Sequence, residues 1–221
     1  MALLVSEFYI SLAGETSWVG LPCTFIRLAG CNLNCSWCDT PYARQGGEAA
    51  SVEELAAKAV ETGTKLVCVT GGEPLLQQET PKLVKKLLKA GRRVLVETNG
   101  SLAIDTLPAR AHRIVDVKTP SSGEVKSFLM DNLSRLTTRD EIKFVVANMR
   151  DFNWAVRFVK KNDLAERCGL LVSPVWSIGS KPSDDRRFRQ TLAEGVLTSG
   201  ITFRYNLQFH KVIWGARKKG V

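Results

Sequence analysis

The stretch TFIRLAGCNLNCSWCDT, residues 24–40, joins a strand-like run to three closely spaced cysteines. Its first six residues are mostly apolar or β-branched, and we expect them to form a strand that leads directly into the cysteines. Cys31, Cys35 and Cys38 stand in a C-x3-C-x2-C spacing, so their thiolates can converge on one soft metal centre. A structural zinc site needs a fourth ligand, usually from a second closely spaced pair.

No fourth ligand is evident elsewhere in the sequence. Cys23, Cys68 and Cys168 are isolated in apolar or strand-like surroundings, and His112 and His210 are the only histidines. Three thiolates without a fourth ligand are the pattern of an iron–sulfur cubane that leaves one iron open to a substrate or cofactor. Because we expect the chain to be intracellular, its six cysteines favour metal or redox chemistry over disulfides.

Strand-like and helical runs alternate along the chain on both sides of the cysteines. Ser51 and Glu54 form a capping box before an amphipathic run that ends at Gly63. We expect Thr80 to cap a second helix and Asp151 to open a third. The expected strands are residues 1–14, 24–29, 65–70, 92–100, 112–120, 141–148, 169–176 and 202–208, with a further helix near 184–195.

This alternation predicts an α/β fold with a parallel sheet and a site at the C-terminal ends of its strands, where the polar residues gather. Six to seven strands with few helices favour a partial, TIM-like β/α barrel over a closed one of eight strands. The chain has 221 residues, 44% of them hydrophobic, which suffices for one sizeable core. We therefore expect one domain over residues 1–221.

Composition and charge limit the partners. No apolar run approaches the roughly 18–20 residues of a membrane span, and the N-terminus lacks a basic leader, so we expect a cytoplasmic protein. The net charge is +9, but the basic residues occur in short, scattered clusters without interleaved aromatic residues. We therefore do not expect nucleic acid as a partner. A basic surface also attracts small anionic substrates or an acidic protein.

The segment GCNLNCSWC resembles the cluster motif of the radical S-adenosylmethionine enzymes, and TGGEP at 70–74 follows a strand where that superfamily carries its glycine-rich cofactor motif. The resemblance implies a [4Fe-4S] cluster whose open iron is chelated by the amine and carboxylate of S-adenosylmethionine. Gly71 and Gly72 would let the backbone approach the methionine moiety, and Glu73 would accept a hydrogen bond from its ammonium group.

The longer segment GETSWVGLPCTFIRLAGCNLNCSWCDT, residues 14–40, is similar to the 7-carboxy-7-deazaguanine synthase family of the queuosine and deazapurine pathway. This similarity implies that Thr40 contributes an oxygen ligand to Mg2+ and that Arg27 binds the substrate carboxylate through its planar fork. The alternatives are a turn or capping role for Thr40 and an internal salt bridge for Arg27.

The same resemblance assigns further contacts. Backbone groups around Leu12, Ala13 and Gly14, with the carboxylate of Glu15, would wrap a pterin ring, although the family usually has glutamine where this chain has Ala13. The other implied substrate contacts are Thr70, Gln208 and His210, and the implied cofactor contacts are Trp37, Cys38, Asp39, Gly72, Glu73, Asn99, Asp116 and Lys118. Polar residues in 97–100 and 116–118, and Lys143, would serve the adenosine ribose or simply cap the barrel rim.

The implied reaction begins with reductive cleavage of S-adenosylmethionine to methionine and a 5′-deoxyadenosyl radical. That radical would abstract hydrogen from C6 of 6-carboxy-5,6,7,8-tetrahydropterin, which would then contract its ring and lose ammonia to give 7-carboxy-7-deazaguanine. An acidic electron donor such as flavodoxin would dock on the basic surface. A homodimer would cover the exposed edges of a partial barrel.

Two alternatives stay open from the sequence. A glycyl-radical-enzyme activase shares the C-x3-C-x2-C loop but would need neither Glu15 and Arg27 nor Mg2+ at Thr40. A non-catalytic iron–sulfur or zinc module with a basic, RNA-contacting surface would bind metal without cleaving S-adenosylmethionine.

Overall fold

The computed structural model describes residues 2–176, 182–215 and 218–221, and a nine-stranded sheet runs through them in the order β3-β1-β2-β4-β5-β6-β7-β8-β9. The strands are β1 Leu3–Leu12, β2 Pro22–Leu28, β3 Glu48–Ala50, β4 Leu66–Gly71, β5 Arg93–Thr98, β6 His112–Asp116, β7 Glu141–Val146, β8 Gly169–Pro174 and β9 Arg204–Tyr205. Every neighbouring pair from β2 to β9 is parallel, whereas β1 pairs antiparallel with both β2 and β3. The sheet ends at β3 and β9 without closing, which confirms the incomplete barrel.

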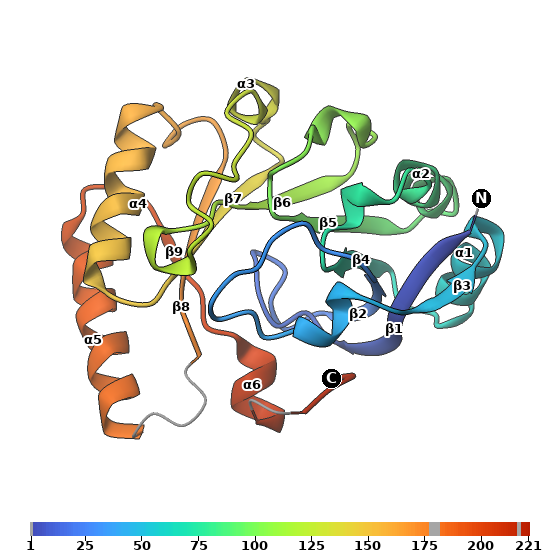
Figure 1. Ribbon diagram of the computed structural model, residues 1–221, viewed down its shortest axis with the longest axis horizontal. Coiled ribbons are helices and arrows are strands. Elements are labelled where there is room, and N and C mark those ends of the chain that lie inside the picture. Colours follow the sequence, from blue (N-terminus) through green and yellow to red (C-terminus); the bar gives the residue numbers. More distant parts are fainter. Residues whose placement is uncertain (1, 177–181, 216–217) are drawn as a thin grey trace.

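Helices cover the outer face of this sheet at two places. They are α1 Val52–Glu61, α2 Thr80–Lys89, α3 Asn132–Arg135, α4 Met149–Lys161, α5 Pro182–Thr198 and α6 Phe209–Trp214. Figure 1 shows α1 and α2 together on one side of the molecule and α4 and α5 together on the other. One core cluster lies under α1 and α2, and a second lies under α4 and α5. No helix of the described residues has the length and hydrophobicity needed to cross a membrane.

Of the three helix starts predicted from the sequence, the structure has one with the predicted capping residues. The capping box of Ser51 and Glu54 is present, which confirms that prediction. Thr80 is not a cap: α2 already includes it, because its hydroxyl donates to the carbonyl oxygen of Pro74 at 2.6 Å. Asp151 does not open α4, because Asn148 caps it and the Asp151 carboxylate instead accepts from the backbone N–H groups of neighbouring segments.

The C-terminal segment differs from the sequence expectation. A strand was expected over 202–208, but β9 contains only Arg204 and Tyr205, and α6 begins at Phe209. A helix of six residues is too short to show a periodic pattern, so α6 was missed. The helix expected near 184–195 lies within α5, which confirms it.

Side chains on the inner face of the sheet change from apolar to charged toward the C-terminal strand ends. Successive residues of a strand face opposite sides, so Leu95 and Glu97 share the inner face of β5, and Ile114 and Asp116 share that of β6. The apolar members form a small inner core of Ala13, Cys23, Leu66, Cys68, Leu95, Ile114 and Leu171. This gradient leaves a polar cavity above an apolar floor.

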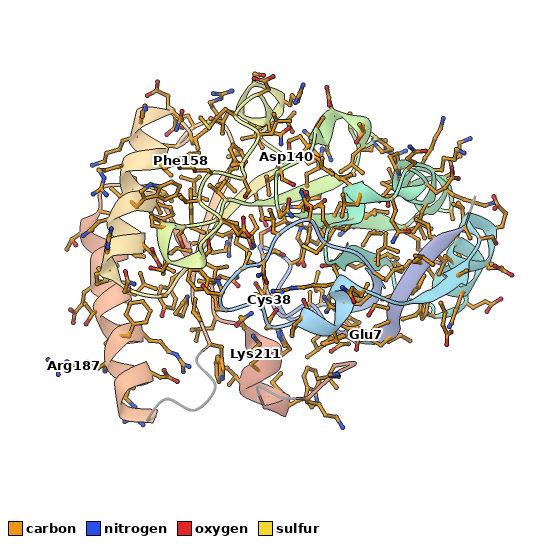
Figure 2. The ribbon with its side chains drawn as sticks, viewed as in Figure 1. Glu7, Cys38, Asp140, Phe158, Arg187 and Lys211 are labelled. Carbon is orange, nitrogen blue, oxygen red and sulfur yellow. The ribbon has the colours of Figure 1, made fainter. Side chains whose placement is uncertain are left out.

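A buried ion pair ties β6 to the segment before β7. Arg113 Nε donates to Asp140 Oδ1 at 2.8 Å and Nη2 to Oδ2 at 2.5 Å, and both side chains are buried. Asp140 (labelled in Figure 2) also accepts from the backbone N–H of Thr137 at 2.8 Å. Burial would raise the pKa of Asp140, but Arg113 and Thr137 outweigh it and hold that pKa below its usual value.

We predict that Asp140→Asn lowers the free energy of unfolding by about 3–5 kcal/mol, because it leaves the Arg113 guanidinium buried without a counter-charge. Urea unfolding followed by circular dichroism measures the change. Glu53→Gln is the matched control, because its pair with Lys86 lies at the surface, where solvent screens it, and this variant should unfold like the parent.

The same pair sets a pH dependence of known sign. A carboxyl whose pKa is lower in the folded state stabilises the fold fully above its unfolded pKa of about 3.9, and this contribution disappears as the pH falls through the folded pKa. The stability difference between the parent and Asp140→Asn should therefore shrink below about pH 4. A difference that stays constant down to acid unfolding would contradict the role of the charge.

Candidate functional site

A cavity of about 570 Å³ opens at the C-terminal ends of the parallel strands, the place where barrels of this type carry their sites. Its lining includes nearly all of the residues predicted from the sequence: Leu12, Ala13, Gly14, Glu15, Arg27, Cys31, Cys35, Trp37, Cys38, Asp39, Thr40, Thr70, Gly72, Asn99, Asp116, Lys118, Gln208 and His210. Glu73 does not line it.

The three closely spaced cysteines lie on one loop that follows β2, and all three are partly exposed to the cavity. Ser36 holds this loop in place, because its N–H donates to Ser122 O at 3.0 Å and its hydroxyl to Ser121 O at 2.8 Å. Figure 2 shows Cys38 on this loop, in front of the sheet.

The other three cysteines are buried within the fold. Burial raises the pKa of the Cys23 thiol to about 12 and that of Cys168 to about 11. Cys68 reaches the cavity floor, but it is nearly inaccessible and burial raises its pKa well above the usual value. These three thiols therefore offer no fourth ligand beside the loop.

The donor set fits a cluster with one open iron. Three soft sulfur donors on one loop face a cavity large enough for a further ligand. Among residues 2–176, 182–215 and 218–221, no three His, Cys, Asp or Glu side chains lie close enough together to hold a single metal ion.

Gly71, the last residue of β4, and Gly72 allow the backbone of this turn to contact the start of the cysteine loop. A Cβ atom at Gly72 would lie 2.1 Å from Gly30 O and 2.8 Å from Cys31 Cβ, and the Gly72 N–H donates to Leu28 O at 3.1 Å. At Gly71 the φ angle is 147° and a Cβ atom would lie 2.1 Å from Leu28 O. The ends of β4 and β2 therefore meet backbone to backbone, and this contact sets the position of Cys31.

Glu73 differs from the sequence expectation. Its carboxylate accepts hydrogen bonds from Leu75 N at 2.9 Å, Thr98 Oγ1 at 2.8 Å and Asn99 N at 2.6 Å, and its side chain is buried. The carboxylate thus ties the end of β4 to the end of β5 and does not face the cavity.

Polar residues at the ends of β5 and β6 lie beside the cysteine loop. The side chain of Asn99 donates to Asn32 Oδ1 on that loop at 3.0 Å. Lys118 and Asp116 form an ion pair at 3.1 Å, and both line the cavity. These residues were predicted as cofactor contacts, and the structure brings them to the same end of the cavity as Cys35.

Glu15 forms the centre of a buried polar cluster. Its Oε2 lies 2.5 Å from Lys143 Nζ, and its Oε1 accepts from Gln208 Nε2 at 2.9 Å. Burial would raise the pKa of Glu15, but Lys143, His210 and Gln208 lower it to about 2. Glu15 is therefore a carboxylate at neutral pH, poised to accept from N–H donors of a ligand. Lys143, which we expected to serve the adenosine ribose or to cap the barrel rim, pairs with Glu15 and lines the cavity.

Arg27 forms the internal salt bridge that was its alternative role, and it also lines the cavity. Its Nε lies 2.7 Å from Glu7 Oε2 and its Nη2 donates to Tyr9 OH at 3.1 Å, so the internal salt bridge is present. Arg27 also lines the cavity, and among the described residues its Nη1 has no hydrogen-bonding protein partner. The Glu7 and Tyr42 side chains complete this cluster through a bond of 2.9 Å.

Thr40 lies on the cavity wall directly before a 3-10 helix, Pro41–Arg44. Its carbonyl oxygen accepts from Ala43 N at 3.0 Å, but its hydroxyl makes no capping hydrogen bond. Thr40 thus takes the turn position that was its alternative role, through its backbone and without a capping bond from its hydroxyl.

Sequence reasoning missed several lining residues. Glu7 and Tyr9 lie two apart on β1, opposite β2, and this period-2 spacing was the available signal. Glu97 lies in the ETNG run, where only Asn99 was predicted by number as a contact, and it accepts from Thr70 Oγ1 at 2.8 Å. Lys211 of α6 pairs with Asp39, which follows the last cysteine of the loop, at 2.7 Å. Nothing in the sequence indicated this pairing. Figure 2 shows Lys211 below Cys38.

Comparison with known proteins gives concordant results. The model of the Radical SAM superfamily matches residues 25–121. A 7-carboxy-7-deazaguanine synthase of Koribacter versatilis is 39% identical over 98% of this chain and 99% of its own length. The enzyme of that name from Methanospirillum hungatei is 40% identical over 95% of this chain and 84% of its own. A crystal structure of QueE from Escherichia coli matches with a TM-score of 0.75 and 25% identity, covering 95% of both chains.

We predict that Cys31→Ala, Cys35→Ala and Cys38→Ala each abolish iron binding, because each removes one of three ligands that have no replacement nearby. Anaerobic reconstitution followed by iron analysis measures this, with circular dichroism as the test of folding. Cys23→Ala and Cys168→Ala are the matched controls and should keep about four irons per chain. Iron loss in either control would mean that the wrong ligands were assigned.

Proposed function

The chain belongs to the 7-carboxy-7-deazaguanine synthase family of radical S-adenosylmethionine enzymes, and on this premise we propose that it converts 6-carboxy-5,6,7,8-tetrahydropterin to 7-carboxy-7-deazaguanine with loss of ammonia. One observation carries the proposal beyond the family name. A single cavity brings together three cysteines, an ionised Glu15 and an arginine with a free edge. These groups match a cluster, the ring of a pterin and its carboxylate.

Cys31, Cys35 and Cys38 would hold the [4Fe-4S] cluster, with S-adenosylmethionine beside Gly72, Asn99 and the Asp116–Lys118 pair. When bound and reduced, the cluster and cofactor supply the radical that abstracts hydrogen from the substrate. The protein contributes position and exclusion of water. Trp37 and Asp39, which also line the cavity, would contact the cofactor from the cluster loop.

The substrate ring would bind beside the Glu15 carboxylate, against the wall that Gly14 and His210 form together. A 2-amino-4-oxopyrimidine presents two adjacent N–H donors, and a carboxylate that is ionised at neutral pH accepts both. His210 already packs on Gly14, where an added Cβ atom would lie 2.2 Å from His210 Nδ1. Backbone groups of Leu12 and Ala13 and the side chains of Thr70 and Gln208 would complete the wall.

The substrate carboxylate would lie between Arg27 and a Mg2+ ion at Thr40. Arg27 is fixed by Glu7 and Tyr9, so it would bind a carboxylate without further ordering. The free hydroxyl of Thr40 would give Mg2+ one protein oxygen, and substrate and water would supply the rest, as this hard cation prefers. The ion would orient the carboxylate and stabilise charge during ring contraction.

The wider setting is also proposed from charge and topology. The net charge of +9 favours docking of an acidic electron donor such as flavodoxin, and turnover driven by it should fall with added salt, unlike turnover driven by dithionite. A homodimer would cover an open sheet edge, which sedimentation tests. We propose a cytoplasmic location, which cell fractionation tests.

The deciding experiment is an anaerobic assay of the reconstituted protein with S-adenosylmethionine, reductant, Mg2+ and carboxytetrahydropterin. We expect 5′-deoxyadenosine and a deazaguanine chromophore to form together, and chelation of Mg2+ to slow product formation. If cofactor cleavage required a partner protein and its rate did not change when the pterin was added, the result would favour a glycyl-radical-enzyme activase. A colourless protein that forms no 5′-deoxyadenosine would favour the non-catalytic module.

We predict that Arg27→Ala raises the KM for the pterin while iron content and uncoupled cofactor cleavage persist, because the change removes the carboxylate partner but leaves the cluster loop intact. The loss of a bidentate, charge-assisted contact is worth about 1.5–3 kcal/mol, a rise of about 10- to 100-fold. Arg44→Ala is a control, since this cavity arginine bonds to Asn34 and Cys35 of the loop and should change iron retention first. Loss of the cluster in Arg27→Ala would contradict the assignment.

A further inference from the structure

The residue that follows Glu15 has an unusual backbone conformation. Thr16 has a φ angle of 74°, in the left-handed region that β-branched residues rarely adopt. Asp163 is the only other residue besides glycine with positive φ in the described part of the chain. The Thr16 side chain is buried, so this conformation is imposed by its surroundings. Such strain persists only where neighbouring contacts over-determine it.

Two remote side chains grip the peptide unit between Thr16 and Ser17. Its carbonyl oxygen accepts from Asn206 Nδ2 at 3.0 Å. Its N–H, on Ser17, donates to Glu141 Oε1 at 3.2 Å. Both hydrogen-bonding groups of one peptide are therefore fixed by partners that are separated from it by more than a hundred residues of chain.

Both gripping residues are themselves anchored in the sheet. Glu141 is the first residue of β7, and Asn206 follows β9 with its own N–H donating to Val172 O at 2.9 Å. Their side chains are buried. The loop they hold is closed at its neck, where Ala13 N donates to Leu21 O and Gly20 N donates to Ala13 O, both at 2.8 Å.

The register of β7 connects this grip to the site. Residues two apart on a strand face the same side, so Glu141 and Lys143 both point to the inside of the barrel. Glu141 holds the loop at Ser17 and Lys143 holds the Glu15 carboxylate at 2.5 Å. One strand thus fixes the loop on both sides of Thr16.

We propose that Glu141 and Asn206 are positioning residues, which hold the 16–17 peptide in its strained conformation and thereby aim the Glu15 carboxylate into the cavity. This inference rests on the proposed function for what Glu15 binds. Without the grip, Thr16 would relax to negative φ and Glu15 would leave its place beside Lys143 for part of the time.

The test compares four variants of the reconstituted enzyme: Asn206→Asp, which keeps the shape but removes the donor, Glu141→Ala, Glu141→Gln, which keeps an acceptor, and Thr16→Gly, which removes the strain. Relaxation of a residue in the left-handed region should raise the KM for carboxytetrahydropterin by about 5- to 30-fold in Asn206→Asp and Glu141→Ala. Iron content and uncoupled 5′-deoxyadenosine formation should be unchanged. Glu141→Gln should behave like the parent.

The strain predicts that Thr16→Gly changes the effect of Asn206→Asp in opposite directions for the KM and for the melting temperature. In that background Asn206→Asp should raise the KM by less, because glycine accepts the positive φ without the grip. It should lower the melting temperature by more, by about 2–4 °C, because relaxation of Thr16 no longer offsets the lost hydrogen bond. If Asn206 only contributed packing, Thr16→Gly would change neither its effect on the KM nor its effect on the melting temperature.

Asn162→Asp is the matched control, because the Asn162 amide donates to Phe158 O at 2.8 Å at the far end of α4, and this variant should keep the parental KM. Unchanged KM in both Asn206→Asp and Glu141→Ala would overturn the inference, as would equal melting shifts in the two backgrounds. If the parent does not turn over the pterin, the proposed function fails, while the melting couplings still decide whether the strained peptide is held as described.

Discussion

The buried ion pair between Glu15 and Lys143 joins the parts of the chain from which the site is built. A pair of this kind costs desolvation unless the remaining hydrogen-bonding positions are also filled. Here Gln208 fills the second oxygen of Glu15 at 2.9 Å, and the charge of Lys143 keeps the carboxylate ionised despite its burial. The N-terminal loop, β7 and the segment before α6 are thereby held around one charge. The cavity has its shape because these three segments cannot separate without exposing that charge.

The incomplete barrel gives the site its two-layer character. An apolar layer of inner-face residues forms the floor, whereas the inner-face residues near the strand ends are charged and line the cavity. A closed barrel of this size would be filled by its own side chains. An open one leaves room for a cavity, which residues of the cysteine loop and of the C-terminal segment help to line. The antiparallel β1 extends the wall and brings Glu7 and Tyr9 against Arg27.

Much of this arrangement was predictable from the sequence, but for two different reasons. The alternation of strands and helices, the capping box at Ser51 and the cysteine spacing follow from local chemistry. The residues of the cavity wall were found through resemblance to a family, and the parallel sheet then brought them together. Local reasoning failed where a side chain bonds to a partner outside its own helix or turn. Thr80 bonds to Pro74, Asp151 to the segments at Ser121 and Ala147, and Glu73 to the end of β5. Lys211 pairs with Asp39 across 172 residues of chain, a contact that no local pattern contains.

The distance along the chain between Glu15 and Gln208, 193 residues, also fixes when the site can form during synthesis. The chain is made from its N-terminus, so the cysteine loop and the first strands are synthesised long before the segment that carries Gln208. Glu15 and Gln208 can therefore meet only when nearly the whole chain is present, and the last segment to be made is the one that completes the cavity wall.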